Sequence, residues 1–424
     1  MLSSKQMKGS FVFCALFYFV LISASNQRWR QLGATIKGES SMDFSGFSVS
    51  LSDDGSRLAV GAYHNSDAGD KSGHARVFEL QGKSWVQLGA DIDGVSEYDF
   101  SGCSVSLSAD GSRLAVGAYH IVERPDMSAG FIRMFELRDG SWVPLGNVLG
   151  SSTWGDHYGQ SVSLSANGSR VAIGSKYIGT HIFELQGQTW TLLGHRISSE
   201  DETDESGFSV SLSADGNRVA IGAPRSEGEG ILVGRVDVYD YTAGSWVQVG
   251  QSIQGAADFD LLGYSVSLSR DGTRVAAGAS WANNKAGYGR VWELRDGAWE
   301  PLGAAIIGEA EEDISGMSVS LSSDGSRLAI GAPYNDGNNK ESAGHTRVFE
   351  YQAGEWMQLG YDINGEEERD LSGWAVAMSP DGRRVAIGAI VSSSGSGHTR
   401  VFELHSKVDI KLVGVDVNGE VMSS

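Results

Sequence analysis

The sequence contains very little cysteine or proline for its length. Only 2 of its 424 residues are cysteines and only 6 are prolines. Cys14 lies in an apolar N-terminal segment, so Cys103 is left without a partner for an internal disulfide. A domain without disulfides depends on a large apolar core, and about 400 residues are enough to form one. These scarcities exclude a small disulfide-stabilised domain.

Long hydrophobic runs are also scarce. The clearest is Phe11–Ile22, which is shorter than the roughly 20 residues that a membrane-spanning helix needs. Lys5 and Lys8 precede this run and small residues follow it near Ser25, which is the layout of a secretory signal. We expect residues 1–25 to be a signal peptide and the mature protein to be secreted into the extracellular space. The alternative is an uncleaved signal that anchors the protein to the membrane.

Basic residues are outnumbered by acidic ones. The chain has 33 Lys and Arg against 53 Asp and Glu, which gives a formal net charge of −20. A surface of this sign repels nucleic acid and anionic lipid. We therefore expect no nucleic-acid partner and no membrane insertion. Whether the acidity attracts cations and basic partners or only keeps the protein soluble is left open by the composition.

What the sequence does contain is an internal repeat. Asp43–His64 and Asp99–His120 differ only at Phe47/Cys103 and at Asp53/Ala109. A G-x-S-V phrase recurs along the chain, with a last copy that reads GWAV. Its glycines are Gly46, Gly102, Gly159, Gly207, Gly263, Gly316 and Gly373. Seven units of about 50 residues are therefore expected to form one repeating architecture.

Each unit is predicted to contain four strands. In the first unit, these are the alternating stretch 48–52 and the stretches 57–62, 75–80 and 85–92. The first two strands are joined by Asp-Gly or Asn-Gly, which favour tight hairpins. No segment shows a sustained helical period. The sequence therefore predicts an all-β, seven-bladed β-propeller of four-stranded antiparallel blades.

Closure of the ring requires an outer strand for the last unit. Two segments compete for this place: Arg28–Ile36 before the first unit and Asp409–Glu420 after the last. We expect the N-terminal strand to close the ring, because it keeps Trp29, Leu32, Gly33 and Ile36, which match the outer strand 85–92 of the first unit. The predicted organisation is a signal peptide (1–25), the propeller (26–404), and a degenerate outer-strand copy with a C-terminal tail (405–424).

Two stretches, Leu262–Ser280 and Ser315–Pro333, resemble FG-GAP repeats, the propeller units of integrin α-chain heads and related extracellular proteins. The hairpin Met378–Ala389 is similar to the first hairpin of a WD40 blade. The resemblance covers residues 28–404 and implies the architecture, but propellers host unrelated activities. Integrin-type repeats often carry a calcium loop of spaced aspartates. The corresponding hairpins here are too short and too poor in carboxylates, so calcium is not expected there.

Three polar positions are repeated in every unit. We interpret them as structural, because repeats share packing contacts whereas functional sites break symmetry. The aspartates before the motif glycine are Asp43, Asp99, Asp156, Asp204, Asp260, Asp313 and Asp370. The arginines after the hairpin are Arg57, Arg113, Arg170, Arg218, Arg274, Arg327 and Arg384. The third-strand acids are Glu79, Glu136, Glu184, Asp240, Glu293, Glu350 and Glu403.

Binding residues are expected among the unrepeated loops, which emerge on one face of a propeller. The candidate ligand-binding residues are aromatic residues just after the second strand, namely Tyr63, Tyr119, Tyr177, Trp281 and Tyr334. Aromatic rings stack on sugars and clasp protein side chains; the alternative is that these rings only cover the base of the loops. Carboxylate runs at Glu200–Glu205, Gly308–Asp313 and Gly365–Asp370 are either cation-binding or a solvated rim.

Signals for catalysis are weak. The third unit holds the richest local set of unrepeated polar and aromatic side chains, namely Trp154, Asp156, His157, Tyr158, Lys176 and His181. Zinc-protease spacings and a serine nucleophile elbow are lacking. We predict no catalytic residue, no metal site and no cofactor. The sequon at Asn167 is a candidate N-glycosylation site on a hairpin turn.

The function predicted from the sequence is that of a monomeric binding module. Its partner would be an extracellular protein or a polysaccharide, held by the loop-rich face. One alternative is a propeller glycoside hydrolase or lyase that acts on cell-wall carbohydrate. Another is a structural matrix or surface-coat protein.

Overall fold

The computed structural model describes residues 20–119, 130–151, 156–199, 201–228, 230–392, 394–415 and 421–422. Most of the predicted signal peptide, together with His120 and Trp154, lies outside these residues. Trp29–Leu404 forms one compact unit, and the terminal segments form a second, smaller one. No helix in the described part of the chain is long and apolar enough to cross a membrane.

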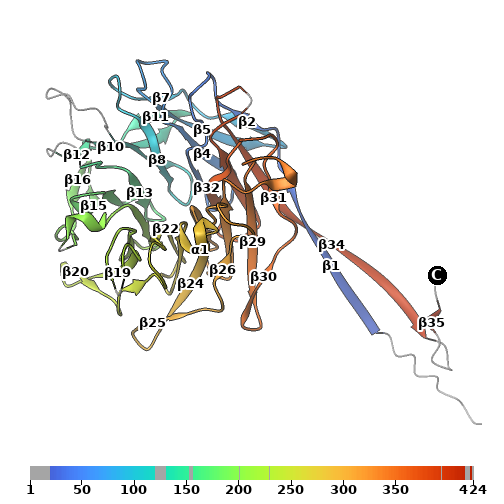
Figure 1. Ribbon diagram of the computed structural model, residues 1–424. Helices are drawn as coiled ribbons and strands as arrows, with labels where there is room; N and C mark the ends of the chain where they lie inside the picture. The colour runs from blue at the N-terminus through green and yellow to red at the C-terminus, as the bar shows by residue number, and fades with distance from the viewer. Residues whose placement is uncertain are drawn as a thin grey trace, which may run out of the picture. The chain divides into compact units, whose positions relative to one another are not determined.

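The larger unit is a seven-bladed propeller of four-stranded antiparallel blades, which confirms the predicted fold class (Figure 1). The blades are numbered in chain order, and their strands are given from the axis outward. Blade 1 consists of β3 (Ser48–Leu51), β4 (Arg57–Ala62), β5 (His74–Gln81) and β6 (Ser84–Gln87), with β7 (Ile92–Asp93) paired to β5. Blade 2 consists of β8 (Ser101–Leu107), β9 (Arg113–Ala118), β10 (Phe131–Arg138) and β11 (Ser141–Pro144), with β12 (Leu149–Gly150). Blade 3 consists of β13 (Ser161–Leu164), β14 (Arg170–Ser175), β15 (Gly179–Gln186) and β16 (Thr189–Leu192).

The remaining blades follow the same order. Blade 4 consists of β17 (Ser209–Leu212), β18 (Arg218–Ala223), β19 (Arg235–Thr242) and β20 (Ser245–Gln248), with β21 (Ile253–Gln254). Blade 5 consists of β22 (Leu262–Leu268), β23 (Arg274–Ala279), β24 (Tyr288–Arg295) and β25 (Ala298–Pro301), with β26 (Ile306–Ile307). Blade 6 consists of β27 (Ser318–Leu321), β28 (Arg327–Ala332), β29 (His345–Gln352) and β30 (Glu355–Gln358), with β31 (Ile363–Asn364). Blade 7 consists of β32 (Ser372–Met378), β33 (Arg384–Ala389), β34 (His398–Val415) and β1 (Val20–Gln31), with β2 (Ile36–Lys37). In the smaller unit, β35 (Val421–Met422) pairs with the end of β34.

The N-terminal strand closes the ring, as predicted. β1 pairs with β34 and so takes the outer place in blade 7. The Trp29 indole donates a hydrogen bond to the Leu359 carbonyl of blade 6 (2.7 Å), and the Trp85 indole of blade 1 donates to the Leu32 carbonyl (2.8 Å). Every other blade makes the same indole-to-carbonyl bond with its predecessor. The donors are Trp142, Trp190, Trp246, Trp299 and Trp356.

The repeated arginines link each blade to the next. Arg57 forms an ion pair with Glu79 of its own blade (3.1 Å) and donates to the Gly111 carbonyl in the hairpin of blade 2 (3.2 Å). The contact recurs around the ring and ends with Arg384, which pairs with Glu403 and donates to the Gly55 carbonyl of blade 1. The structural interpretation of these arginines and acids is confirmed.

The repeated aspartates hold the blade-to-blade loops. Asp43 is buried and accepts the backbone N–H groups of Glu39 (3.0 Å) and Ser40 (2.7 Å). The same pair of bonds is made by Asp99, Asp260, Asp313 and Asp370. Loop backbone that would otherwise be left without acceptors is thereby satisfied. The structural interpretation holds for these aspartates too.

The inner strands pack too closely for most side chains. A Cβ atom built on Gly61 would lie 1.9 Å from the carbonyl oxygen of Gly102, the motif glycine of the next blade. Nearby, the Ser48 hydroxyl donates to the same oxygen (2.8 Å) and the Ser50 hydroxyl accepts the Leu107 N–H (3.0 Å). The close approach and the two hydroxyl bonds explain why the SVSLS and GA phrases repeat.

The seam between blades 7 and 1 differs from the other six. Both serine contacts recur between consecutive blades from blade 1 to blade 7. In blade 7, however, alanines Ala375 and Ala377 occupy the two serine positions, so no hydroxyl is present. Pro380 also lacks the N–H that Ser323 and its equivalents donate to the following hairpin.

Serine at these two positions is expected to stabilise the protein. In the double variant Ala375→Ser/Ala377→Ser, the first hydroxyl would reach the Gly46 carbonyl and the second the Leu51 N–H, as their equivalents do elsewhere. A net gain of about 1 kcal/mol per bond is expected. Urea unfolding of this variant and of the parent measures the gain. An unchanged or lower stability would mean that the seam is spaced differently from the other six.

Candidate functional site

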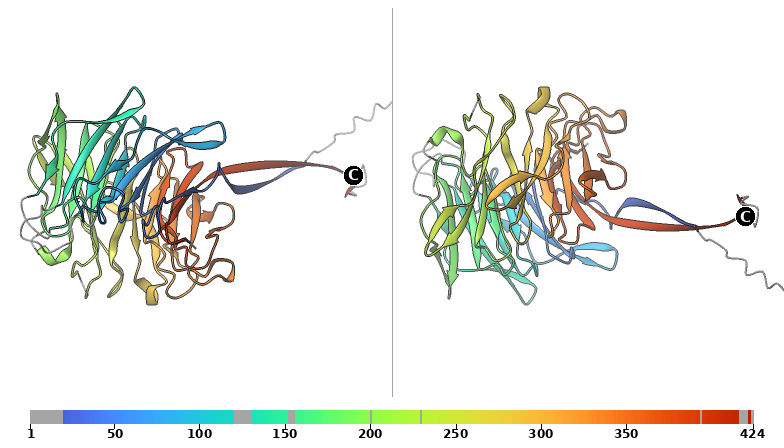
Figure 2. Two further views of the ribbon diagram at one scale, coloured as in Figure 1. Left: turned by 90° about the horizontal axis from the view of Figure 1, so that it is seen from above. Right: turned by 90° about the horizontal axis from the view of Figure 1, so that it is seen from below.

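The long loops emerge on one face of the propeller. They contain all the helical turns of the described residues: η1 (Glu202–Asp204), α1 (Ala282–Lys285) and η2 (Gly337–Asn339). Figure 2 shows the propeller edge-on, with these turns on one side of the blades. The Asp-Gly hairpins lie at the opposite ends of the strands. We refer to the side with the helical turns as the loop face.

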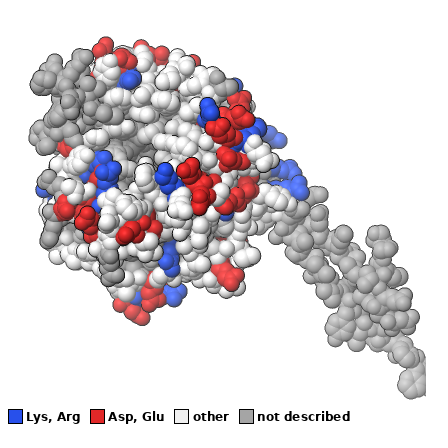
Figure 3. All heavy atoms as spheres, in the orientation of Figure 1, with Lys and Arg blue, Asp and Glu red and all other residues white. Residues whose placement is uncertain are grey.

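A cavity of about 380 Å³ lies at the centre of the loop face (Figure 3). It is lined by Phe47, Gln160, Phe208, Tyr264, Met317, Trp374, Tyr119, His157 and Lys176. The first six of these occupy one position of the repeat, directly after the motif glycine. Because the inner strands converge on the axis, this position brings residues from six blades together. We call this the axial cavity.

Aromatic rings continue outward from the axial cavity over blades 1 to 3. Phe47 lies against Trp374 (ring centroids 5.8 Å apart) and against Tyr63 (4.2 Å). Tyr63 stacks on Tyr119, with centroids 6.5 Å apart. His157 lies between Tyr119 (5.7 Å) and Tyr177 (5.9 Å). One series of ring contacts therefore runs from the cavity over blades 1 to 3.

Blade 3 contributes the polar groups of the axial cavity. Lys176 forms an ion pair with the buried carboxylate of Glu205 (3.0 Å), which also pairs with Arg225 (3.0 Å). The Lys176 ammonium lies 5.5 Å from the Tyr177 ring centroid. Burial, and then the nearby Lys176, lower the pKa of His157, so this imidazole is neutral at pH 7. Gln160 completes this polar sector, and the other lining residues come from blades 1, 2 and 4 to 7.

Cys103 occupies the seventh copy of the axial position but is a packed thiol. Its side chain is buried and its sulfur lies 3.5 Å from the Gly159 carbonyl oxygen. Burial raises the pKa of the thiol to about 12, so the nucleophilic thiolate is not formed at neutral pH. Cys103 is therefore a packing residue rather than a reactive thiol.

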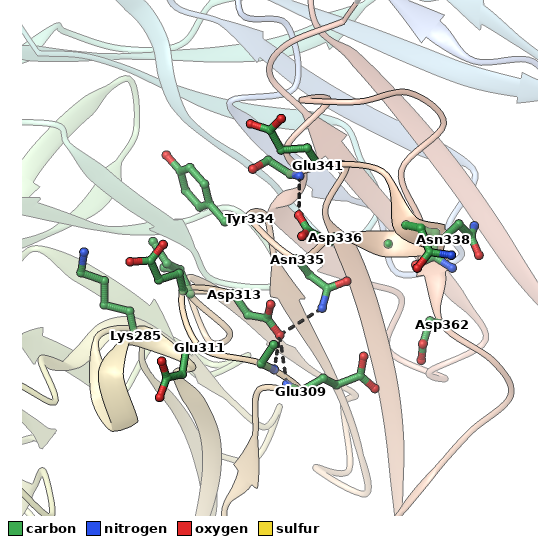
Figure 4. A pocket seen from close by; sticks show the side chains of 17 residues that line it. Lys285, Glu309, Glu311, Asp313, Tyr334, Asn335, Asp336, Asn338, Glu341 and Asp362 are labelled. Carbon is green, nitrogen blue, oxygen red and sulfur yellow. Dashed lines mark hydrogen bonds between the residues drawn. The ribbon is translucent and has the colours of Figure 1, made fainter.

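An acidic groove of about 900 Å³ lies farther out on the loop face, between blades 5 and 6 (Figure 4). Its acidic lining residues are Glu309, Glu311, Glu312, Asp313, Asp336, Glu341 and Asp362, and Lys285 is the basic one. The loop between blades 5 and 6 is held by Asp313, which accepts backbone N–H groups of this loop. Asp313 also accepts a hydrogen bond from the side-chain amide of Asn335 (3.0 Å). The carboxylate run Gly308–Asp313 therefore lines a groove rather than a flat rim.

The structure divides the five predicted binding aromatics into two sets. Tyr119 lines the axial cavity, while Tyr63 and Tyr177 join the same aromatic surface. Tyr334 lines the acidic groove. Trp281 is 46% exposed and lies under the ammonium of Lys285, which also lines the groove (5.3 Å). Whether any of them binds a ligand remains a prediction.

Sequence reasoning missed most of the axial cavity. The signal was present, because the residue after the motif glycine is the most variable position in an otherwise nearly invariant phrase. Of the third-unit set, the structure places His157 and Lys176 in the cavity, whereas Tyr158 is buried against His181 (5.5 Å). Asn167 is exposed at its hairpin turn, where its Oδ1 accepts the Ser169 N–H (2.9 Å). Its glycosylation remains a prediction.

Comparisons with known proteins agree with this architecture. A model of the FG-GAP repeat matches residues 36–78. The solved β-propeller domain of Cps50 (Swd1) from Myceliophteria thermophila is 12% identical, with a TM-score of 0.59 over 88% of this chain and 98% of that chain. A putative 6-phosphogluconolactonase from Bacteroides uniformis is 15% identical, with a TM-score of 0.54 over 76% of this chain and 86% of that chain. Such low identities bear on the fold alone. No curated protein sequence matches the chain.

Proposed function

We propose that this chain, an FG-GAP/WD40-like β-propeller, is a secreted binding module whose axial cavity holds a sugar unit of an extracellular polysaccharide. One observation carries the proposal: the axial cavity combines aromatic faces with a polar sector on its walls. A pyranose ring has an apolar C–H face and a hydroxyl-bearing edge, so it is complementary to such a pair of surfaces. The volume of about 380 Å³ is also in the range of small-ligand sites.

Each part of the cavity has a role in this proposal. Trp374 and Tyr119 present ring surface to the sugar, and Gln160 and His157 exchange hydrogen bonds with its hydroxyls. Lys176 is held by Glu205 and is available to a ring oxygen or to an acidic substituent. The neighbouring rings of Tyr63 and Tyr177 extend the contact surface along the polymer.

Binding to a glycan array tests the proposal, with mature protein produced without its first 25 residues. Trp374→Ala and Tyr119→Ala are expected to weaken binding of the recognised glycan at least about 10-fold, which corresponds to about 1.4 kcal/mol. Trp281→Ala is the matched control, because this tryptophan lies on the same face but beside the acidic groove. Circular dichroism confirms that each variant is folded.

Other outcomes of these assays would indicate a different site, a different class of ligand or a catalytic activity. Loss of binding in Trp281→Ala but not in Trp374→Ala would contradict the axial cavity as the site. Silence across the array would contradict a carbohydrate ligand and favour a protein partner. Cleavage of a bound glycan would favour the hydrolase or lyase alternative.

A further inference from the structure

His74 and His345 are fully buried and have no hydrogen-bond partner in the part of the chain that the structure describes. Their side chains are 0% and 1% exposed, and neither ring nitrogen of either residue has a partner among the described residues. An unpaired polar group in the protein interior costs free energy unless something else satisfies it. These two residues occupy the same place in blades 1 and 6, at the first residues of β5 and β29. A repeated arrangement of this kind calls for a shared explanation.

In both blades, carboxylates surround the Nδ1 atom of the histidine. Glu39 Oε2 and Asp91 Oδ2 lie 3.8 Å and 3.9 Å from His74 Nδ1. In blade 6, Glu309 Oε2 lies 3.9 Å from His345 Nδ1, and Asp362 completes the set within 4.8 Å. These separations are too long for hydrogen bonds. Figure 4 shows the carboxylates of Glu309 and Asp362 close to one another at one end of the acidic groove.

We propose that Glu39, His74 and Asp91, and likewise Glu309, His345 and Asp362, each bind a divalent transition-metal ion such as Zn²⁺. Two ligand atoms on a tetrahedral zinc ion, each about 2.1 Å from it, lie about 3.4 Å apart. The observed separations need only a small inward movement of carboxylates that are partly exposed. Three protein ligands leave a fourth position for water.

The donor set selects the class of ion. Imidazole nitrogen suits zinc and its neighbours, whereas calcium and magnesium prefer oxygen ligands alone. Burial, followed by the nearby Arg76, lowers the pKa of His74 to about 4, so its ring is neutral at pH 7. An ion would satisfy Nδ1 and leave only Nε2 without a partner among the described residues.

The surroundings of each site hold its ligands in place. Arg76 binds the other oxygen of Glu39 (3.2 Å) and so turns Oε2 toward His74. Arg347 does the same for Glu309 (3.5 Å). The Glu39 N–H is anchored on Asp43, as described above. Arg76 carries one positive charge near the site, and the carboxylates of Glu39, Asp91, Asp43 and Asp67 carry the opposite charge.

Blade 7 supplies a natural control within the same chain. His398 occupies the equivalent place and is also buried, and Glu366 is the equivalent of Glu39. The third position, however, is Thr35 instead of an aspartate, and Lys37 adds a positive charge that acts on His398. We expect no metal ion to bind in this blade.

Metal analysis of the untagged mature protein tests the proposal. Protein stripped with a chelator and equilibrated with Zn²⁺ is passed over gel filtration, and its zinc content is measured by mass spectrometry. Two ions per chain are expected. His74→Gln and His345→Gln should each lower the content to one ion, the double variant should bind none, and His398→Gln should keep two.

A second set of variants distinguishes loss of a metal ligand from misfolding of the protein. Asp91→Asn and Asp362→Asn keep the shape of partly exposed side chains and should each remove one ion. Zn²⁺ should also raise the unfolding temperature of the parent but not that of the double variant. A parent that binds no zinc, or a double histidine variant that binds as much as the parent, would overturn the proposal. Neither readout involves a glycan, so the result is independent of the proposed function.

Discussion

Removal of the residues before Gly38 is expected to lower the free energy of unfolding of the protein by at least about 5 kcal/mol. This truncation takes away β1 and β2, with the Trp29 bond to Leu359, the acceptor of the Trp85 indole, and the buried side chain of Ile36. It also leaves β34 as an unpaired edge, which favours association between chains. Differential scanning calorimetry and gel filtration measure the two effects.

A chain that ends at His405 is the control for this truncation. It keeps the whole register of β33 with β34, which runs from Arg384↔Glu403 to Ala389↔His398. We therefore expect its propeller to unfold at nearly the same temperature as that of the parent. If the truncated N-terminus left the unfolding temperature unchanged, β1 would not be the strand that closes the ring.

Trp299→Ala is expected to lower the free energy of unfolding by about 3–5 kcal/mol, the usual range for truncation of a buried aromatic residue. Trp299 is 3% exposed, belongs to the apolar core between blades 4 and 5, and donates to the Val249 carbonyl (2.8 Å). Trp142 makes the equivalent bond to Leu88 (2.9 Å) but is only half-buried. Trp142→Ala should therefore lower the free energy of unfolding by clearly less than Trp299→Ala does.

Comparison of the two tryptophan variants separates the contribution of burial from that of the hydrogen bond. Both variants lose the same indole bond, so a difference in their free energies of unfolding, measured with urea, reports the apolar contacts alone. Equal losses would mean that the indole bond, and not the packing, dominates the contribution of the outer strands.

The fold could be predicted from the sequence because its determinants are local. Asp-Gly or Asn-Gly hairpins, alternating strands and the Arg57–Glu79 type of pair recur in every unit, and seven copies leave few architectures possible. The orphan strand at Arg28–Ile36 could be assigned because it carries the same tryptophan and glycine as the other outer strands. All of these signals are present within single repeats.

The sites were harder to predict because their residues are separated in the sequence and meet only in the folded chain. Phe47 and Tyr264 meet in the axial cavity only through the convergence of inner strands. His74 is far in sequence from Glu39 and Asp91, so no short ligand spacing marks the group. The outer tryptophans share one motif, yet Trp299 is buried and Trp142 is not, because neighbouring side chains decide their exposure. Contacts of this kind depend on three-dimensional packing, which a repeat pattern does not encode.

The pairing of β1 with β34 imposes an order on biosynthesis. β1 leaves the ribosome before the seven blades, but its partner β34 is made only after a delay on the order of 20–80 s at typical rates of synthesis. During this time six blades can fold on their own local contacts, while the N-terminal strand stays without its partner. A chain released before β34 has been made would have six finished blades and two unmatched edges. Full-length synthesis is thus a condition for a closed ring, and incomplete chains become recognisable to quality control by their exposed strands.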